Sequence, residues 1–193
     1  MNEEHGLSEA LARDLDGHFE QLVVAFQDRL YGFALRLLGS TRDAEESTQD
    51  AFVRAYRALQ GYSAERRRAL HLRAWLFQIT LNVVRNRVRR QALPAVPMTD
   101  ELADVLPSNV HAEQPEQASL RRERLLELSR EIAALPERYA AAVVLRHVQG
   151  LSYEETASIL NQPVGTTKSD VHRGLRLLRD SLGGGLVSAK RAS

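Results

Sequence analysis

The stretch LSYEETASILNQPVGTTKSDVHRG, residues 151–174, predicts two short helices joined by a tight turn. Ser152 and Glu155 have the spacing of a capping box, in which each side chain accepts a hydrogen bond from the other residue's backbone N–H. Asn161 tolerates the left-handed backbone of a tight turn, and Pro163 breaks the chain before the second helix. The stretch therefore predicts a helix–turn–helix.

The second of these helices carries a candidate DNA-binding face. Hydroxyls near a helix N-terminus suit phosphate, and Lys and Arg suit phosphate or guanine edges. The inner stripe of the second helix is predicted to be Val164, Val171, Leu175 and Leu178. The residues predicted to contact DNA on the outer face are Thr166, Lys168, Ser169, Arg173 and Arg176.

Asp170 fits this face poorly because an acid repels phosphate. Its carboxylate could accept a hydrogen bond from a cytosine amine, pair with Arg173 on the same helix, or bind a partner protein. The sequence leaves these three roles open. The whole stretch is also compatible with a helical hairpin that binds no DNA.

The rest of the chain predicts an all-α fold, because apolar residues recur at three- and four-residue steps and no segment alternates like a strand. Gly39 is the expected cap of the first long helix. Residues 61–71 are predicted to form a loop. The helices expected before the helix–turn–helix cover about 18–39, 40–61, 72–91, 118–136 and 136–150.

The connecting segment differs in composition from the helices around it. Four of the six prolines lie between residues 91 and 118, and residues 98–119 hold five acids with no Lys or Arg. Such a segment predicts a flexible linker between two small helical domains. The expected parts are an N-terminal extension (1–18), a first domain (19–91), an acidic linker (92–118), a second domain (119–182) and a disordered tail (183–193).

Charge and composition narrow the function further. The net charge of the 193 residues is only +1, yet residues 61–90 hold eight arginines and one acid, which indicates a polyanion-binding face. The absence of cysteine excludes disulfides and thiolate zinc sites, and the six scattered histidines predict neither a metal site nor a cofactor. No apolar run approaches the roughly 18 residues of a membrane span, and the start of the chain is unlike a signal peptide. We therefore expect a cytoplasmic protein with no membrane insertion of its own.

Two separate motif sets resemble one family. LPERYAAAVVLRHVQGLSYEETASILNQPVGTTKSDVHRGLRLLRDSL, residues 135–182, resembles the C-terminal domain of bacterial extracytoplasmic-function (ECF) sigma factors of the sigma-70 family. RLYGFALRLLGSTRDAEESTQDAFVRAYRAL and RAWLFQITLNVVRNRVRR, residues 29–59 and 73–90, resemble the N-terminal domain of the same family. The resemblance implies a sigma-2-like helical bundle and a sigma-4-like helix–turn–helix. Thr156, Thr167 and Asp170 depart from the family's usual residues.

The resemblance also implies partners and roles. Members bind core RNA polymerase and promoter DNA, and an anti-sigma factor holds many of them inactive. The second domain would read the −35 element as duplex, with a recognition helix over about Val164–Arg179 whose N-terminal part enters the major groove. The residues that would contact a coiled coil of the largest polymerase subunit are Glu46, Gln49, Asp50 and Arg54. The residues that would melt and read the −10 element are Tyr62, Arg66, Arg67, Arg68, His71, Arg73, Asn82, Arg85 and Arg89.

Three further expectations accompany this assignment. Trp75 is interpreted as a core residue rather than a base-stacking one, since its neighbours at helical spacing are apolar. The chain is expected not to be an enzyme, because it lacks a carboxylate cluster with metal-site spacing. The competing functions are a stand-alone helix–turn–helix regulator, which leaves the first ninety residues without a role, and a nuclease.

Overall fold

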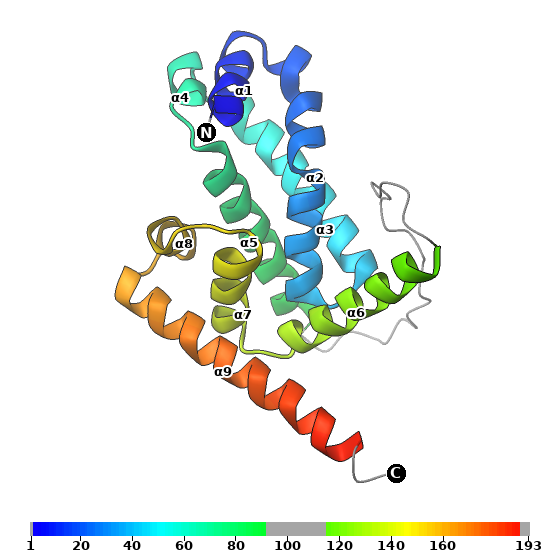
Figure 1. Ribbon diagram of the computed structural model, residues 1–193. Helices are drawn as coiled ribbons and strands as arrows, with labels where there is room; N and C mark the ends of the chain where they lie inside the picture. The colour runs from blue at the N-terminus through cyan, green and yellow to red at the C-terminus, as the bar shows by residue number, and fades with distance from the viewer. Residues whose placement is uncertain (1, 92–114, 190–193) are drawn as a thin grey trace. The chain divides into compact units, whose positions relative to one another are not determined.

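The computed structural model describes the backbone of residues 2–91 and 115–189, and the side chains of residues 4–90 and 123–182. All the regular elements in these ranges are helical, which confirms the all-α prediction (Figure 1). Most of the predicted linker, residues 92–114, lies outside the described residues. The helices fall into two compact units, one containing α1 to α5 apart from residues 35–40, and one containing α6 to α9.

The first unit is a bundle of three long helices with two shorter elements. The long helices are α2 (Leu15–Leu38), α3 (Thr41–Gln60) and α5 (Leu72–Gln91). Phe33 of α2 meets Phe77 of α5 edge to face, with the ring centroids 5.2 Å apart. Such edge-to-face pairs add to the stabilisation that burial of the rings provides. The largest fully buried side chains of this core include Leu22, Phe26, Leu30, Phe33, Leu59, Leu76, Phe77 and Leu81.

Two elements of this unit were missed by the sequence analysis. Helix α1 (Asn2–Arg13) occupies most of the predicted extension, and the short helix α4 (Ala64–Arg68) forms within the predicted loop. Ser63 caps α4 by accepting a hydrogen bond from the backbone N–H of Arg66. The side chain of Leu11 on α1 is fully buried. Helices α1 and α4 lie against each other, so the start of the chain covers one side of the loop region (Figure 1).

The second unit holds the helix–turn–helix. Its elements are α6 (Pro115–Ala133), α7 (Glu137–Val143) with a π-helical turn η1 (Val144–Val148), α8 (Tyr153–Leu160) and α9 (Val164–Ala189). Helix α7 packs on α9 at Gly174, where a Cβ atom would lie 2.6 Å from Cγ2 of Val143. Helix α9 continues to Ala189, so it extends into the segment predicted to be a disordered tail.

The start of α8 and the turn between α8 and α9 both have the predicted geometry. The hydroxyl oxygen of Ser152 accepts from the backbone N–H of Glu155 at 3.1 Å, and the Glu155 carboxylate accepts from the N–H of Ser152 at 2.7 Å. Asn161 adopts the left-handed conformation with φ of 52°. The capping box and the helix–turn–helix are therefore confirmed.

Candidate nucleic-acid and protein interfaces

The predicted −35 face of α9 is exposed to solvent. Ser169 donates its hydroxyl hydrogen to the carbonyl of Gly165 at 3.0 Å, which leaves the hydroxyl oxygen as an acceptor for a base amine or a water. The five predicted contact residues on this exposed face are Thr166, Lys168, Ser169, Arg173 and Arg176. The structure thus brings all five to the surface of one helix.

Asp170 does not lie on this face. Its side chain is only 3% exposed, and Oδ2 accepts a hydrogen bond from Nε2 of Gln162 at 3.3 Å. The predicted inner stripe was also wrong at Leu175, which is 38% exposed. Both corrections follow from the close crossing at Gly174, which turns toward the core the residues three and four positions before it, Val171 and Asp170, while Leu175 beside it faces away. The buried stripe of α9 is Thr167, Asp170, Val171, Gly174 and Leu178.

The two threonines that depart from the family pattern are core residues with bonded hydroxyls. Thr156 donates to the carbonyl of Ser152 at 2.7 Å, and Thr167 donates to the carbonyl of Pro163 at 3.2 Å. Both side chains are fully buried. Each hydroxyl donates to the carbonyl of the residue that directly precedes its own helix, so burying the hydroxyl leaves no unsatisfied donor.

A cationic cluster next to the −35 face was not predicted. The guanidinium of Arg146 lies 4.8 Å from the ring centroid of Tyr153, and Nζ of Lys168 lies 5.5 Å from the same centroid. Arg146 is further fixed by donating to the carbonyl of Leu151 at 2.7 Å. Both cations lie within cation–π range of one ring. The sequence carries little signal for this cluster, because Arg146, Tyr153 and Lys168 belong to three different helical elements.

Two arginines predicted to bind the −10 element, Arg66 and Arg67, have different surroundings in the structure. Arg66 is exposed and stacks over Tyr62, with 3.7 Å between Cζ and the ring centroid. Arg67 instead donates to two backbone carbonyls, those of Leu59 at 2.9 Å and Leu11 at 3.4 Å. Arg66 is therefore placed to meet a ligand, whereas Arg67 ties α4 to α3 and α1.

Arg68 is held by the N-terminal helix. Its Nε atom lies 2.5 Å from Oε2 of Glu9, and this bond lowers the pKa of the Glu9 carboxyl. A pocket of about 580 Å³ opens beside this pair and includes His71 of the predicted −10 set. Its lining residues are Glu4, His5, Ser8, Arg68, Ala69, Leu70, His71 and Leu72.

The remaining −10 candidates lie along α5. Arg73 and Arg85 are half-exposed, and Asn82 and Arg89 are exposed. Arg89 donates to Oδ1 of Asn86 at 3.0 Å. Trp75 is half-buried rather than part of the closed core, and its ring centroid lies 6.1 Å from that of Tyr62.

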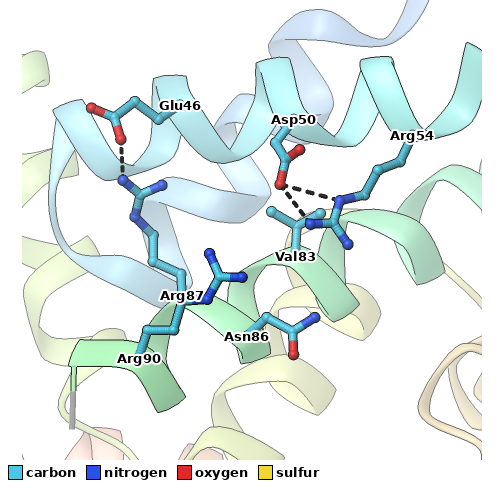
Figure 2. Close-up of a pocket in the computed structure, with 7 residues that line it drawn as sticks. All are labelled: Glu46, Asp50, Arg54, Val83, Asn86, Arg87 and Arg90. Carbon is cyan, nitrogen blue, oxygen red and sulfur yellow. Dashed lines mark hydrogen bonds and ion pairs between the residues drawn. The ribbon is translucent and has the colours of Figure 1, made fainter. Parts of the chain in front are cut away.

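Three of the four predicted polymerase-binding residues, Glu46, Asp50 and Arg54, line a groove between α3 and α5. Asp50 accepts two hydrogen bonds from Arg54, at 2.9 and 3.1 Å, and Glu46 pairs with Arg87 of α5 (Figure 2). Gln49 is exposed on the same helix. The groove has a volume of about 410 Å³ and is lined by Glu46, Asp50, Arg54, Val83, Asn86, Arg87 and Arg90.

Arg87 neutralises part of the acidity of α3. It lies 2.7 Å from Oδ1 of Asp43 and also bonds Glu46. Burial alone would lower the pKa of Arg87, but its bonds to the two carboxylates outweigh this and raise the pKa. The pKa of Glu46 is lowered, chiefly by its bond to Arg87 and then by Arg42 at 3.2 Å. The groove therefore presents paired charges of both signs.

Within the described residues, no three His, Asp or Glu side chains form a group that could bind a metal ion. None of the helices in the described ranges is long and apolar enough to cross a membrane.

Each of the two units matches a family of known proteins. Residues 22–93 match the family model for Sigma-70 region 2, and residues 125–178 match that for Sigma-70 region 4. The chain is 31% identical over 170 residues to the ECF RNA polymerase sigma factor SigW of Bacillus subtilis, with 85% of this chain and 88% of SigW covered. It is 36% identical over 166 residues to the ECF RNA polymerase sigma factor SigE of Mycolicibacterium smegmatis, covering 85% of this chain but only 61% of SigE.

The solved structures show the same fold. CnrH in complex with the cytosolic domain of CnrY has a TM-score of 0.67 at 23% identity, covering 94% of this chain and 97% of that chain. The sigma factor RpoE of Bartonella quintana, in complex with the anti-sigma factor NepR, has a TM-score of 0.63 at 23% identity, covering 86% and 96%. Both regions of the family are present in one chain, and SigW is matched over most of its length. The chain therefore belongs to the ECF sigma factors of the sigma-70 family.

Proposed function

We propose that this chain binds core RNA polymerase and directs it to promoters, using the first unit for the −10 element and the second for the −35 element. The observation that carries the proposal is the presence, in one chain, of a sigma region 2 bundle and a capped region 4 helix–turn–helix. A stand-alone regulator would need only the second of these.

At the −10 element, the proposed reading group is Tyr62 with Arg66. Unstacked bases bind to aromatic or guanidinium planes, and the backbone of a single strand follows a positively charged track. Arg66 already lies over the Tyr62 ring, so the pair offers a flat cationic surface to a base or phosphate. Arg67 and Arg68 are proposed to support this contact from within the protein, since both bond internal partners. The residues proposed to follow the phosphates are His71, Arg73, Asn82, Arg85 and Arg89.

At the −35 element, α9 would enter the major groove with its exposed residues. We add Arg146 and Tyr153 to the predicted contacts, because Lys168 shares its aromatic neighbour with Arg146. The Tyr153 hydroxyl and the two cations would bind backbone phosphates, which fixes the position of the helix on the duplex. Base reading then falls to the exposed residues of α9.

For polymerase binding, we propose the α3 face with Glu46, Gln49, Asp50 and Arg54. The paired charges of the groove suit a polar protein surface with both signs rather than a nucleic acid. Charged groups at such a surface increase the rate and specificity of association more than the affinity.

Regulation and location follow from the same function. CnrH and RpoE were each solved with a second protein, and in RpoE this partner is named as an anti-sigma factor. We propose that an anti-sigma factor also controls this chain and that the chain acts in the cytoplasm, where core polymerase works. It is not an enzyme in this proposal, since nucleotide addition belongs to the core. The segment between α5 and α6, residues 92–114, would tether the −10 and −35 domains.

The test is run-off transcription with core polymerase on a promoter library, preceded by co-purification with the core. The chain should bind core and enrich a class of promoters with paired −10 and −35 elements. Lys168→Ala should weaken this enrichment, whereas Arg179→Ala, three turns further along α9 and fully outside the predicted contacts, should not. A chain that binds duplex DNA tightly and specifically but never binds core would overturn the proposal in favour of a stand-alone regulator.

A further inference from the structure

Asp170 is an ionisable residue in the core of a small DNA-binding unit. It sits in the second turn of α9 between buried Thr167 and buried Val171, and only 3% of its surface is exposed. A carboxylate buried without a hydrogen-bond partner is strongly destabilising. The burial of Asp170 therefore depends on the side chains that donate hydrogen bonds to its carboxyl group.

Gln162 provides that bond from the turn. Its Nε2 amide donates to Oδ2 of Asp170 at 3.3 Å and to Oγ1 of Thr167 at 3.1 Å. The backbone N–H of Gln162 donates to the carbonyl of Ala157 in α8 at 3.1 Å. A single turn residue is thus bonded to α8 through its main chain and to α9 through its side chain.

This arrangement constrains the direction of α9. Apolar contacts permit small sliding and rotation, but hydrogen bonds require a narrow range of distance and angle. Lys168 and Ser169 flank Asp170 on the exposed side of the same turn. Any rotation of that turn would move both of them relative to the DNA.

We propose that Asp170 and Gln162 are a pair of positioning residues for −35 recognition, which set the orientation of α9 while Asp170 contacts no base. The proposal rests on the function proposed above. It replaces the three roles that the sequence left open for Asp170 with a fourth, an internal one.

The test compares four variants in the full-length chain assembled with core polymerase. The probe is a promoter library randomised over the −35 region, from which bound sequences are counted. The variants are Asp170→Asn, Asp170→Ala, Gln162→Ala and the double Ala variant. Asp180→Asn is the matched control, because it makes the same change on an exposed carboxylate of the same helix.

The expected results separate positioning from direct reading. Asn retains a carbonyl oxygen that accepts from Gln162, so Asp170→Asn should keep the base preference and bind within about twofold of the unaltered chain. Asp170→Ala and Gln162→Ala should each lower binding roughly tenfold, evenly over all −35 positions. The double variant should bind no more weakly than the weaker single variant, since the two changes remove one interaction.

Other outcomes would overturn the proposal. A carboxylate only accepts hydrogen bonds whereas an amide also donates, so a changed preference at one base pair in Asp170→Asn would show direct reading. Unchanged −35 binding by Asp170→Ala or Gln162→Ala would show that the pair has no positioning role. Circular dichroism confirms that each variant is folded at the assay temperature. If Asp170→Ala unfolds, the proposal is tested by the other two single variants. Gln162→Ala changes a half-buried residue, and Asp170→Asn changes the side chain only slightly.

The −35 enrichment by the unaltered chain distinguishes a wrong positioning role from a wrong proposed function. If the unaltered chain enriches no −35 sequence, the function proposed above is wrong and the positioning role falls with it. If the unaltered chain enriches a −35 sequence but the binding or base preference of the variants differs from the expected results, only the positioning role is wrong.

Discussion

Replacing Arg87 with alanine should destabilise the first unit. Arg87 of α5 bonds both Asp43 and Glu46 of α3, and it joins residues more than forty positions apart. Its side chain is 25% exposed and that of Asp43 is 22% exposed. The substitution removes the cation and leaves two acids close together on α3.

The magnitude lies between those of exposed and buried ion pairs. Exposed pairs contribute about 0–1 kcal/mol, and breaking a buried pair costs about 3–5 kcal/mol. With Arg87 and Asp43 mostly covered but Glu46 half-exposed, we expect a loss of about 1–2 kcal/mol. In a domain of this size, that corresponds to a fall of about 5–15 °C in melting temperature.

Trp75 makes the measurement specific to this unit. It is the only tryptophan of the chain and lies on α5 with Arg87, so its fluorescence reports the unfolding of this unit within the full-length protein. Arg90→Ala is the matched control, because it removes an exposed arginine of the same helix and the same groove. Arg90→Ala should leave the melting temperature almost unchanged.

The effect should also depend on pH. The pKa of Glu46 in the folded chain lies below its ordinary value of 4.5, chiefly because of Arg87. A lowered folded-state pKa stabilises the fold above the ordinary value, and this stabilisation is lost as the pH falls through the folded-state value. The difference between the unaltered chain and Arg87→Ala should therefore be full near neutral pH and shrink below about pH 4.5. Equal melting of the Arg87 and Arg90 variants at neutral pH would refute this reasoning.

Three further substitutions test other contacts. Gly174→Ala should destabilise the second unit by about 1–3 kcal/mol, because the new Cβ would press on Val143; circular dichroism melting measures this, and an unchanged melt would show that α7 and α9 can move apart. Ser152→Ala should cost about 1 kcal/mol in the same assay through loss of the capping box, and Ser152→Thr should retain most of it. Glu9→Gln should free Arg68 for single-stranded DNA and steepen the log–log salt dependence of binding by about 0.7, a change that Glu20→Gln should not produce.

Local patterns predicted most of the fold because the long helices carry strong signals. Helix α3 ends next to Gly61 as expected, and Gly39 adopts the left-handed conformation with φ of 68° that its capping role requires. Helix α4 has only five residues, and so short a helix is unstable without tertiary contacts. Its stability depends on Arg67 and on helix α1, more than fifty residues earlier in the sequence. Pattern reasoning has no access to such contacts.

The orientation of α9 was mispredicted for a different reason. Leu175 was placed inside because it is apolar, and Asp170 outside because it is charged. Gly174 carried the correct signal, since a glycine within a helix often marks a close crossing, and α7 packs there. Counting back by three, four and seven residues from Gly174 gives Val171, Asp170 and Thr167, which are all buried, and counting forward by four gives buried Leu178, whereas Leu177 at three residues forward is 37% exposed. Val171 and Leu178 were correctly placed inside as apolar residues, and the small residue Gly174 marks the same face.

Internal bonds of three arginines reduce the number of phosphate contacts expected from the arginine-rich segment, residues 61–90. The eight arginines of residues 61–90 suggest eight phosphate contacts if each one faces DNA. Arg67 is bonded to two carbonyls, Arg68 to Glu9, and Arg87 to Asp43 and Glu46. Each arginine that stays with its internal partner removes about 0.7 from the log–log salt slope expected for single-stranded DNA. A slope corresponding to fewer than six phosphate contacts would therefore agree with the structure. A slope corresponding to all eight would mean that these bonds break when the promoter binds.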